Sequence, residues 1–199
     1  MSIAHPSSSE DVCSPRTVPL AWVACAVAAA GTAGSLFLSL GLGLKACPLC
    51  FYQRTFVMAA FSVGLVGLWI EPKRPGLTTL LMLPLSWAGL GVAAFHESLV
   101  MSGKLECPLA LFGLGTAPAQ SLTLFVLLVA VNTLAAWSGR CESARSSAAI
   151  PAVFLFGGLL AYGSIATAPP LPPTPTAAYD PVKQPLEMCR PPFRGSPSS

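Results

Sequence analysis

Residues 47–54 read CPLCFYQR and lie at the junction between two long apolar segments. The stretch holds two cysteines, Cys47 and Cys50, with Tyr52 and Arg54 following within one helical turn. Two cysteines at this spacing can close a small disulfide and reopen it, which is the basis of dithiol redox chemistry. A pair placed at a membrane boundary can exchange electrons with a water-soluble protein and with a lipid-soluble carrier.

The composition indicates an integral membrane protein. The 199 residues are 53% hydrophobic and only 10% charged, whereas a soluble globular chain carries about 25% charged residues. Long uncharged runs accompany this deficit, as a membrane protein requires. The net charge of +3 is small and spread along the chain, which argues against nucleic acid as a partner.

Five apolar runs predict the fold. A bilayer-spanning helix needs about 20 residues, and the runs are near this length. They lie at roughly Val18–Leu44, Phe51–Ile70, Leu77–Phe95, Leu122–Trp137 and Ala148–Thr167. We therefore expect an all-α, polytopic membrane four-helix bundle with an extra fifth transmembrane helix. The first run lacks a basic leader beside a short apolar core, so we interpret it as a retained helix and not a signal peptide.

Changes in composition along the chain predict four parts. Residues 1–17 form a disordered cytoplasmic N-terminus, and residues 18–137 form the four-helix transmembrane domain. Residues 138–167 hold a cytoplasmic loop and the fifth helix. Residues 168–199 form a Pro-rich tail on the outer side. We expect this tail to act as a semi-rigid spacer that carries Cys189 along the membrane surface.

Basic residues in the short loops predict the orientation of the chain. Two loops hold two basic residues each, at positions 73–74 and at positions 140 and 145. The loops that contain Cys47 and Cys107 hold one lysine each. We therefore expect the two more basic loops and the N-terminus in the cytoplasm. The loops with Cys47 and Cys107, and the tail, then face outward.

The residues around the cysteine pair suggest how it is activated. A helix beginning at Pro48 would place Cys50 in its first turn, where unpaired amides and the helix dipole lower the pKa of a thiol. Arg54 lies four residues later on the same face, where it would favour a Cys50 thiolate or donate to a ligand carbonyl. The alternatives are a structural disulfide, a simple interfacial arginine, and half a zinc site. Because zinc sites usually add a second pair or two histidines at recognisable spacing, and the chain has only His5 and His96, we expect no metal.

Further polar residues are predicted at the same outer end. His96 ends the third apolar run, where it is either an interfacial residue or part of an apolar pocket with a few convergent polar groups. Cys107 lies in the outer loop, and Cys189 is the remaining cysteine expected to face outward. We therefore propose a Cys107–Cys189 disulfide, the alternatives being that Cys189 is free or pairs between molecules. The other cysteines are interpreted as reduced bystanders, and they are Cys13, Cys25 and Cys141.

Over residues 18–137 the chain resembles the DsbB family of membrane thiol oxidases. The hallmark of that family is Cys-x-x-Cys followed by an aromatic-x-Arg pattern that opens the second span, which residues 47–54 match. A histidine at the end of the third span, here His96, and a cysteine in the following outer loop, here Cys107, also resemble the family pattern.

The resemblance implies a four-helix inner-membrane protein of bacteria that reoxidises a periplasmic thioredoxin-fold oxidase, DsbA, and passes the electrons to ubiquinone or menaquinone. The N-terminus would be cytoplasmic and the redox cysteines periplasmic. Cys47 and Cys50 would form the quinone-linked pair, with Cys50 as the thiolate beside the quinone ring. Arg54 would contact the quinone headgroup, and His96 would assist quinone binding or proton handling. Cys107 would belong to the second pair, which exchanges with the partner.

The chain departs from the family pattern in its second cysteine pair. That pair normally lies within the loop after the third span, and the family normally ends after four spans. A Cys107–Cys189 disulfide would supply the pair from a new place, and we expect the tail to swing toward Cys47 during exchange. One rival is a vitamin-K-epoxide-reductase-like quinone reductase, whose Cys-x-x-Cys usually lies in a late span. Another is a non-enzymatic membrane protein with a structural disulfide, which would not need Arg54 beside its thiols.

Overall fold

The computed structural model describes residues 17–193 except 71, 73–74, 139–145, 171–172, 176, 179, 181 and 183–184. Its elements are α1 (Thr17–Leu40), α2 (Pro48–Ile70), α3 (Pro75–Met101), the short 3₁₀ helix η1 (Leu111–Gly113), α4 (Ala117–Ser138) and α5 (Ser146–Ala166). Strands are absent from these described residues, which form only isolated bridges. The all-α prediction is therefore confirmed. Residues 1–16 and the four basic residues of the loops expected in the cytoplasm, at positions 73, 74, 140 and 145, lie outside the described residues.

Four helices, α1 to α4, are long and apolar enough to cross a membrane, and the chain is a multi-pass membrane protein. The apolar part of α5, Pro151–Ala166, is shorter. The 27 residues of α3 correspond to about 40 Å at 1.5 Å per residue, more than the ~30 Å of a bilayer's hydrocarbon layer. The C-terminal turns of α3 therefore extend to one end of the bundle, and they carry His96 there.

The first helix is shorter than the sequence predicted. The expected run reached Leu44, whereas α1 ends at Leu40. The amides of Gly41 and Leu42 both bond to the carbonyl of Phe37, at 2.7 and 3.1 Å, and Gly43 has a positive φ of 68°. Glycine adopts this left-handed conformation without steric cost, so it ends the helix. The chain then runs without regular structure to α2.

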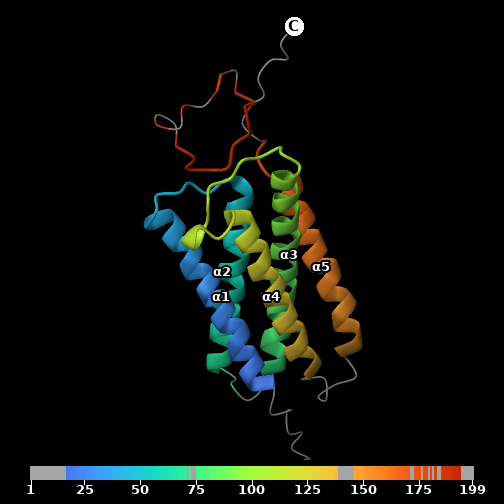
Figure 1. Ribbon diagram of the computed structural model, residues 1–199. Coiled ribbons are helices and arrows are strands. Elements are labelled where there is room, and N and C mark those ends of the chain that lie inside the picture. The colour runs from blue at the N-terminus through green and yellow to red at the C-terminus, as the bar shows by residue number, and fades with distance from the viewer. Residues whose placement is uncertain are drawn as a thin grey trace, which may run out of the picture.

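The helices pack as a four-helix bundle with α5 alongside α3 (Figure 1). Close approach of α5 requires glycine. A Cβ at Gly157 would lie 2.8 Å from the Cβ of Trp87, and one at Gly91 would lie 2.8 Å from that of Ala161. The rings of Trp87 and Phe154 also lie side by side, with centroids 4.7 Å apart. Small residues at contacts of this kind let apolar helices associate where no hydrophobic effect drives them together.

A buried hydrogen bond links α3 to α4 at mid-bundle. The amide of Asn132 donates to Ser86 Oγ over 3.2 Å, and both side chains are fully buried. The Ser86 hydroxyl in turn donates to the Met82 carbonyl at 2.8 Å. Polar pairs of this kind hold helices together within a bilayer.

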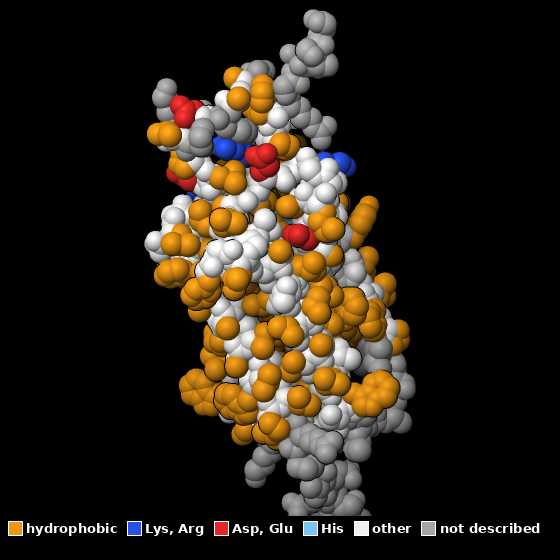
Figure 2. Space-filling view, in the orientation of Figure 1, with side chains coloured by type: hydrophobic (Ala, Val, Ile, Leu, Met, Phe, Trp, Pro, Cys, Tyr) orange, Lys and Arg blue, Asp and Glu red, His pale blue; other side chains and the backbone are white. Residues whose placement is uncertain are grey.

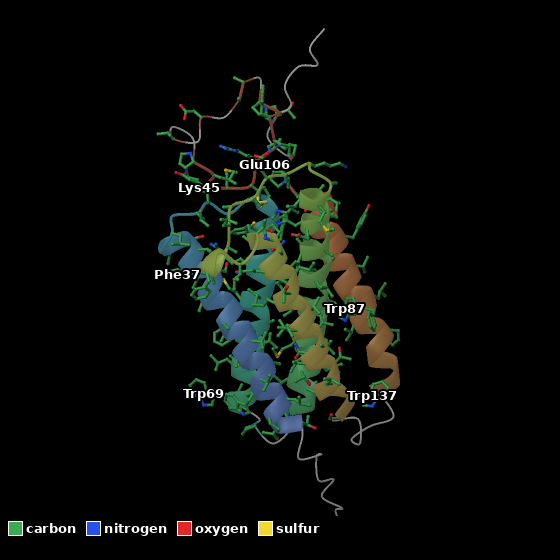
Figure 3. The ribbon with its side chains drawn as sticks, viewed as in Figure 1. Phe37, Lys45, Trp69, Trp87, Glu106 and Trp137 are labelled. Atoms are coloured by element: carbon green, nitrogen blue, oxygen red, sulfur yellow. A yellow bond between two sulfur atoms is a disulfide. The ribbon has the colours of Figure 1, made fainter. Side chains whose placement is uncertain are left out.

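The α1–α2 connection, the α3–α4 loop and the tail lie at the same end of the bundle (Figure 1). Charged side chains appear at that end, and hydrophobic ones cover the sides of the helices (Figure 2). Figure 3 shows Lys45 and Glu106 there, and Trp69 and Trp137 at the opposite end. Trp69 and Trp137 are 82% and 65% exposed. Exposed tryptophans near the ends of spanning helices are typical of the membrane–water interface.

The tail is built into this end of the molecule. The amide of Lys45 bonds to the Glu187 carbonyl at 2.8 Å. Three residues further along the tail, the backbones of Arg190 and Glu106 exchange two hydrogen bonds, of 2.8 and 3.0 Å. The segment between Glu187 and Arg190 therefore lies between the α1–α2 connection and the α3–α4 loop, and it places Cys189 over the end of the bundle.

Candidate functional site

The first turn of α2 brings the two cysteines of the CPLC stretch together. Cys47 precedes the helix and Pro48 is its first residue. The sulfurs of Cys47 and Cys50 lie 3.0 Å apart, and both are free thiols. The amide of Cys50 donates to Cys47 Sγ over 3.3 Å, which is the bond that a helix N-cap side chain accepts. Cys50 lies in the first turn of α2, as expected, and the cap position itself falls on Cys47.

His96 lies between the two cysteine pairs. The ring is fully buried, and its Nε2 lies 3.8 Å from Cys47 Sγ and 3.6 Å from Cys107 Sγ. The other nitrogen, Nδ1, lies 4.0 Å from Cys50 Sγ. One imidazole therefore contacts sulfurs that come from α2 and from the loop after α3.

Gln53 is a site residue that the sequence analysis missed. Its side-chain nitrogen lies 3.2 Å from His96 Nδ1, and both side chains are buried. An amide nitrogen only donates, so Nδ1 accepts and the ring proton is on Nε2, facing Cys47 and Cys107. The signal in the sequence was a glutamine three residues after Cys50, hence on the same helix face.

A disulfide joins Cys107 to Cys189, with 82 residues between them in sequence and 4.2 Å between their Cα atoms. This is the pair expected from the topology. The expected swing of the tail is not needed, however. The ligand atoms of Cys47, Cys50, His96 and Cys189 all lie within 4.8 Å of one another. The backbone bonds beside Cys189 hold the tail against the first pair already.

Arg54 connects α2 to α1. Its Nε donates to Ser35 Oγ at 2.8 Å, one terminal nitrogen donates to the Ser35 carbonyl at 3.1 Å, and the same nitrogen bonds to Ser39 Oγ. The two serines lie one helical turn apart on α1, so they face the same neighbour. They fix the guanidinium one turn below Cys50. The sequence analysis named Arg54 but did not find these partners.

An apolar cavity of about 650 Å³ lies beside this arginine, between α1, α2, α4 and the α3–α4 loop. Cys50, Gln53 and Arg54 line it together with small and aliphatic residues such as Gly34 and Leu124. Cys47 and His96 are not part of its wall. A mostly apolar cavity of this size with a few polar groups is typical of a site for a small organic ligand. Its wall joins an apolar lining to the Arg54 guanidinium and the Cys50 thiol.

The electrostatics of the pair favour a thiolate on Cys47. The hydrogen bond from Cys50, with a further contribution from His96, lowers the pKa of Cys47 to about 5, and burial opposes this. Lys45 forms an ion pair with Glu187 beyond these cysteines, with nitrogen and oxygen 2.9 Å apart. This ion pair raises the pKa of Lys45. Both lysine and glutamate are exposed there, so this pair contributes little to stability.

The sequence model described as disulfide bond formation protein DsbB matches residues 15–149, more than half of the chain. Disulfide bond formation protein B of Psychrobacter sp. is 32% identical over 138 residues, covering 51% of this chain and 80% of the relative. A probable disulfide formation protein of Chlamydia trachomatis is 30% identical over 126 residues, covering 58% of this chain and 89% of the relative. No solved structure matches the chain.

The family match spans α1 to α4 with their connections, which together carry the CPLC stretch, His96 and Cys107. The region beyond it contains most of α5 and the tail with Cys189. The first four helices therefore carry the family pattern, and the chain belongs to the DsbB family of disulfide bond formation proteins.

Proposed function

We propose that this chain is a thiol:quinone oxidoreductase that reoxidises a periplasmic, DsbA-like thioredoxin-fold oxidase and passes two electrons to quinone. The observation that carries the proposal is the convergence of both cysteine pairs on His96, with the sulfurs of Cys47, Cys50 and Cys189 within 4.8 Å of one ring nitrogen and of one another. Exchange between two disulfides requires their sulfurs to come into near contact. A purely structural disulfide does not need a second cysteine pair beside it.

The first step takes place at Cys107–Cys189. A thiolate of the partner attacks one sulfur of this disulfide, forming a mixed disulfide and releasing the other sulfur as a thiolate. The second partner thiol then resolves the mixed disulfide. The partner leaves as a disulfide, and Cys107 and Cys189 hold the two electrons and two protons as thiols.

The second step moves the electrons to the CPLC pair. A thiolate of the tail pair attacks the Cys47–Cys50 disulfide, and resolution restores Cys107–Cys189 and leaves Cys47 and Cys50 as thiols. The state in the structure, with two free thiols and one disulfide, corresponds to this point. The Nε2 proton of His96 lies between Cys47 and Cys107, where it can protonate a departing thiolate.

The third step takes place at the cavity, which Cys50 lines and Cys47 does not. Quinone supplies a two-electron, two-proton acceptor there. Arg54, held by two serines of α1, positions a carbonyl oxygen by hydrogen bonding. Cys50 presents its sulfur to the cavity while Cys47 re-forms the disulfide behind it. We assign separate tasks to Cys47 and Cys50 because only Cys50 borders the cavity.

The test is quinone reduction by the purified protein in detergent, with a reduced DsbA-like oxidase as the electron donor. Loss of the quinone absorbance is followed for the native chain and for Cys50→Ser, Cys107→Ser and Cys189→Ser. Cys25→Ser is the matched control because Cys25 is a buried free thiol of α1 outside the cluster. We expect turnover to be lost in the three site variants and kept in the control. Full turnover by Cys107→Ser would contradict the relay.

The proposal also places the cysteine end of the bundle in the periplasm and the N-terminus in the cytoplasm. Since the tail begins where α5 ends, at the same end as the start of α2 (Figure 1), α5 crosses the membrane as a fifth span. Labelling of Cys189 in intact cells with an impermeant thiol reagent, after reduction, tests this. Labelling only after lysis would contradict the orientation.

A further inference from the structure

Four metal-ligating side chains meet in the cysteine cluster. Cys47 and Cys50 come from the start of α2, His96 from the end of α3, and Cys189 from the tail. Their ligand atoms all lie within 4.8 Å of one another. Cys47, His96 and Cys189 are buried and Cys50 is half-buried. The sequence predicts no metal because it shows no second ligand pair near the first, and the fold supplies the missing ligands from two distant segments.

The distances are close to those of a tetrahedral zinc site. Zinc binds cysteine sulfur at about 2.3 Å and histidine nitrogen at about 2.0–2.1 Å, so neighbouring ligand atoms lie roughly 3.4–3.8 Å apart. Cys47 Sγ lies 3.8 Å from Nε2 of His96, the nitrogen that would bind the metal. The four ligand atoms, one from each residue, are at most 4.8 Å apart. The 3.0 Å between the two cysteine sulfurs must widen by less than about 1 Å. Side-chain rotation accounts for changes of this size.

We propose that Cys47, Cys50, His96 and Cys189 bind one zinc ion when the Cys107–Cys189 disulfide is reduced. In the disulfide, the Cys189 sulfur is bonded to carbon and sulfur and is not a thiolate ligand. Reduction by a dithiol adds two electrons and two protons, giving thiols at Cys107 and Cys189 while the dithiol becomes a disulfide. Zinc then binds the three sulfurs as thiolates, and the thiol protons still present on them are released to solvent.

Gln53 completes the outer part of this site. A histidine that binds zinc through Nε2 carries its proton on Nδ1 and donates it to a neighbouring acceptor. The Gln53 amide is 3.2 Å from Nδ1, and rotation of that amide brings its oxygen to the same place. The same residue therefore serves either state of the ring, as a donor in the metal-free chain and as an acceptor in the zinc-bound one.

Zinc at this position would stop electron transfer. Thiolates that ligate the metal are unavailable for disulfide exchange, and both pairs contribute ligands. All four thiols coexist when electrons arrive from the partner and no quinone accepts them, so zinc binds the quinone-starved protein selectively. This consequence rests on the proposed function, whereas the binding site does not, since it requires only the four side chains in reduced form.

The experiment measures zinc alone, without partner or quinone. The full-length protein carrying Cys13→Ser and Cys141→Ser, which removes two thiols outside the cluster, is purified in detergent and kept anaerobic. Its zinc affinity is measured by competition with a chromophoric chelator, once after reduction by a phosphine and once with Cys107–Cys189 intact. Bound zinc per chain is counted by elemental analysis. Cobalt substitution reports cysteine ligation by its ligand-to-metal charge-transfer absorption.

The matched pair of variants is Cys107→Ser and Cys189→Ser. Neither can form the disulfide, so the tail is equally free in both, but only the second lacks a proposed ligand. Loss of an outer contact to a metal site costs 10–100-fold in affinity, so loss of a direct ligand is expected to cost at least about 100-fold. We expect the reduced native chain and reduced Cys107→Ser to bind one zinc per chain. The affinity of Cys189→Ser and of the oxidised native chain for zinc should be lower by at least about 100-fold.

Three results would overturn the proposal. One is equal zinc affinity of the reduced and oxidised protein, and another is equal affinity of the two tail variants. The third is cobalt bound without sulfur charge-transfer absorption. Thermal unfolding of each variant in the absence of metal establishes that it is folded, and His96→Ala provides an independent ligand deletion that leaves every cysteine in place. These readouts do not involve quinone turnover, so they separate failure of the zinc site from failure of the proposed function.

Discussion

The Nε2 atom of His96 lies 3.6 Å from the sulfur of Cys107, and the same atom lies 3.8 Å from the sulfur of Cys47. These sulfurs belong to different cysteine pairs, so a single imidazole nitrogen faces both partners of an internal disulfide exchange. Its ring is fully buried and does not line the apolar cavity. The position favours proton handling over quinone binding, which were the two roles expected for His96.

Replacing His96 by asparagine should therefore slow exchange and leave quinone affinity unchanged. General acid–base catalysis by a positioned side chain contributes about 10²–10⁴-fold, and we expect a loss in that range for electron transfer between the pairs. Stopped-flow mixing with reduced partner, followed by acid quenching and thiol mapping, measures the exchange. The KM for quinone is measured in steady state. A higher KM with unchanged exchange would assign His96 to the quinone site instead.

Gln53 is expected to act as a positioning residue through the ring tautomer. Gln53→Glu replaces the amide by a carboxylate, which only accepts hydrogen bonds, so Nδ1 then carries the ring proton and Nε2 no longer donates toward Cys47 and Cys107. The exchange rate should therefore fall. Gln53→Leu removes the hydrogen bond and leaves either tautomer available, so it should lower the rate less. Stopped-flow exchange rates of the two variants measure this, and equal rates would mean that Gln53 serves packing alone.

The pKa of Cys47, lowered to about 5, predicts how the reduction potential of the CPLC pair depends on pH. Above that pH the reduced pair holds one proton instead of two, so its potential should fall by about 30 mV per pH unit, half the slope of an ordinary dithiol. The thiolate is lost as the pH falls through about 5, and there the slope doubles. Equilibration with redox buffers between pH 4 and roughly 8 measures the slope.

The same shift has a consequence for stability. A pKa that is lower in the folded chain than in the unfolded one stabilises the reduced protein above the unfolded value, about 8.5 for cysteine. That contribution falls progressively as the pH drops through about 5. The pH dependence of thermal unfolding of the reduced chain measures this, and Cys47→Ser is its control because it removes the titrating group.

The reduction potential gives the contrary outcome: a slope of about 60 mV per pH unit for the CPLC pair of the native chain across the whole pH range would contradict a Cys47 thiolate.

The apolar runs sufficed to predict five helices and their order, because a helix that spans a membrane needs about 20 consecutive apolar residues. The start of α2 was also readable, since Pro48 suits only the first turn. The end of α1 was not, because Gly43 continues an apolar run while its positive φ takes the chain out of the helix. Apolar character alone does not record that conformation.

The site was predicted less completely than the fold. CPLC, Arg54 and His96 stand out as chemistry in an apolar context. The partners Ser35, Ser39 and Gln53 are small or neutral side chains whose roles depend on which helix faces α2. The location of Cys189 depends on backbone pairing between segments far apart in sequence. Local pattern carries no information about such pairing, so a tail that swings was expected where the structure has one that is fixed.

Filling the cavity should impair quinone use selectively. Gly34 lines the cavity, and a Cβ there would lie 3.2 Å from Leu111 Cδ1. The leucine side chain of Gly34→Leu must therefore enter the open space of the cavity. A mismatch of one methylene in an apolar binding pocket changes ligand recognition by roughly 10- to 200-fold, and we expect the KM for quinone to rise by at least that much. Gly158→Leu is the matched control, because a Cβ at Gly158 meets nothing within 4 Å. Similar KM values for the two variants would place the quinone elsewhere.

Arg54 should distinguish a fixed hydrogen-bond donor from a simple positive charge. Lysine keeps the charge but cannot reproduce the fork that bonds Ser35 Oγ and Ser39 Oγ together. A hydrogen bond to a charged group contributes about 1.5–3 kcal/mol, so Arg54→Lys is expected to raise the KM for quinone by roughly 10- to 150-fold. Arg54→Met, which removes the charge as well, should raise it further. Steady-state assays at several quinone concentrations measure both, with thermal unfolding as the companion readout. Lower stability with an unchanged KM would mean that Arg54 only joins α1 to α2, because a guanidinium that binds quinone must affect KM even when the helices stay packed.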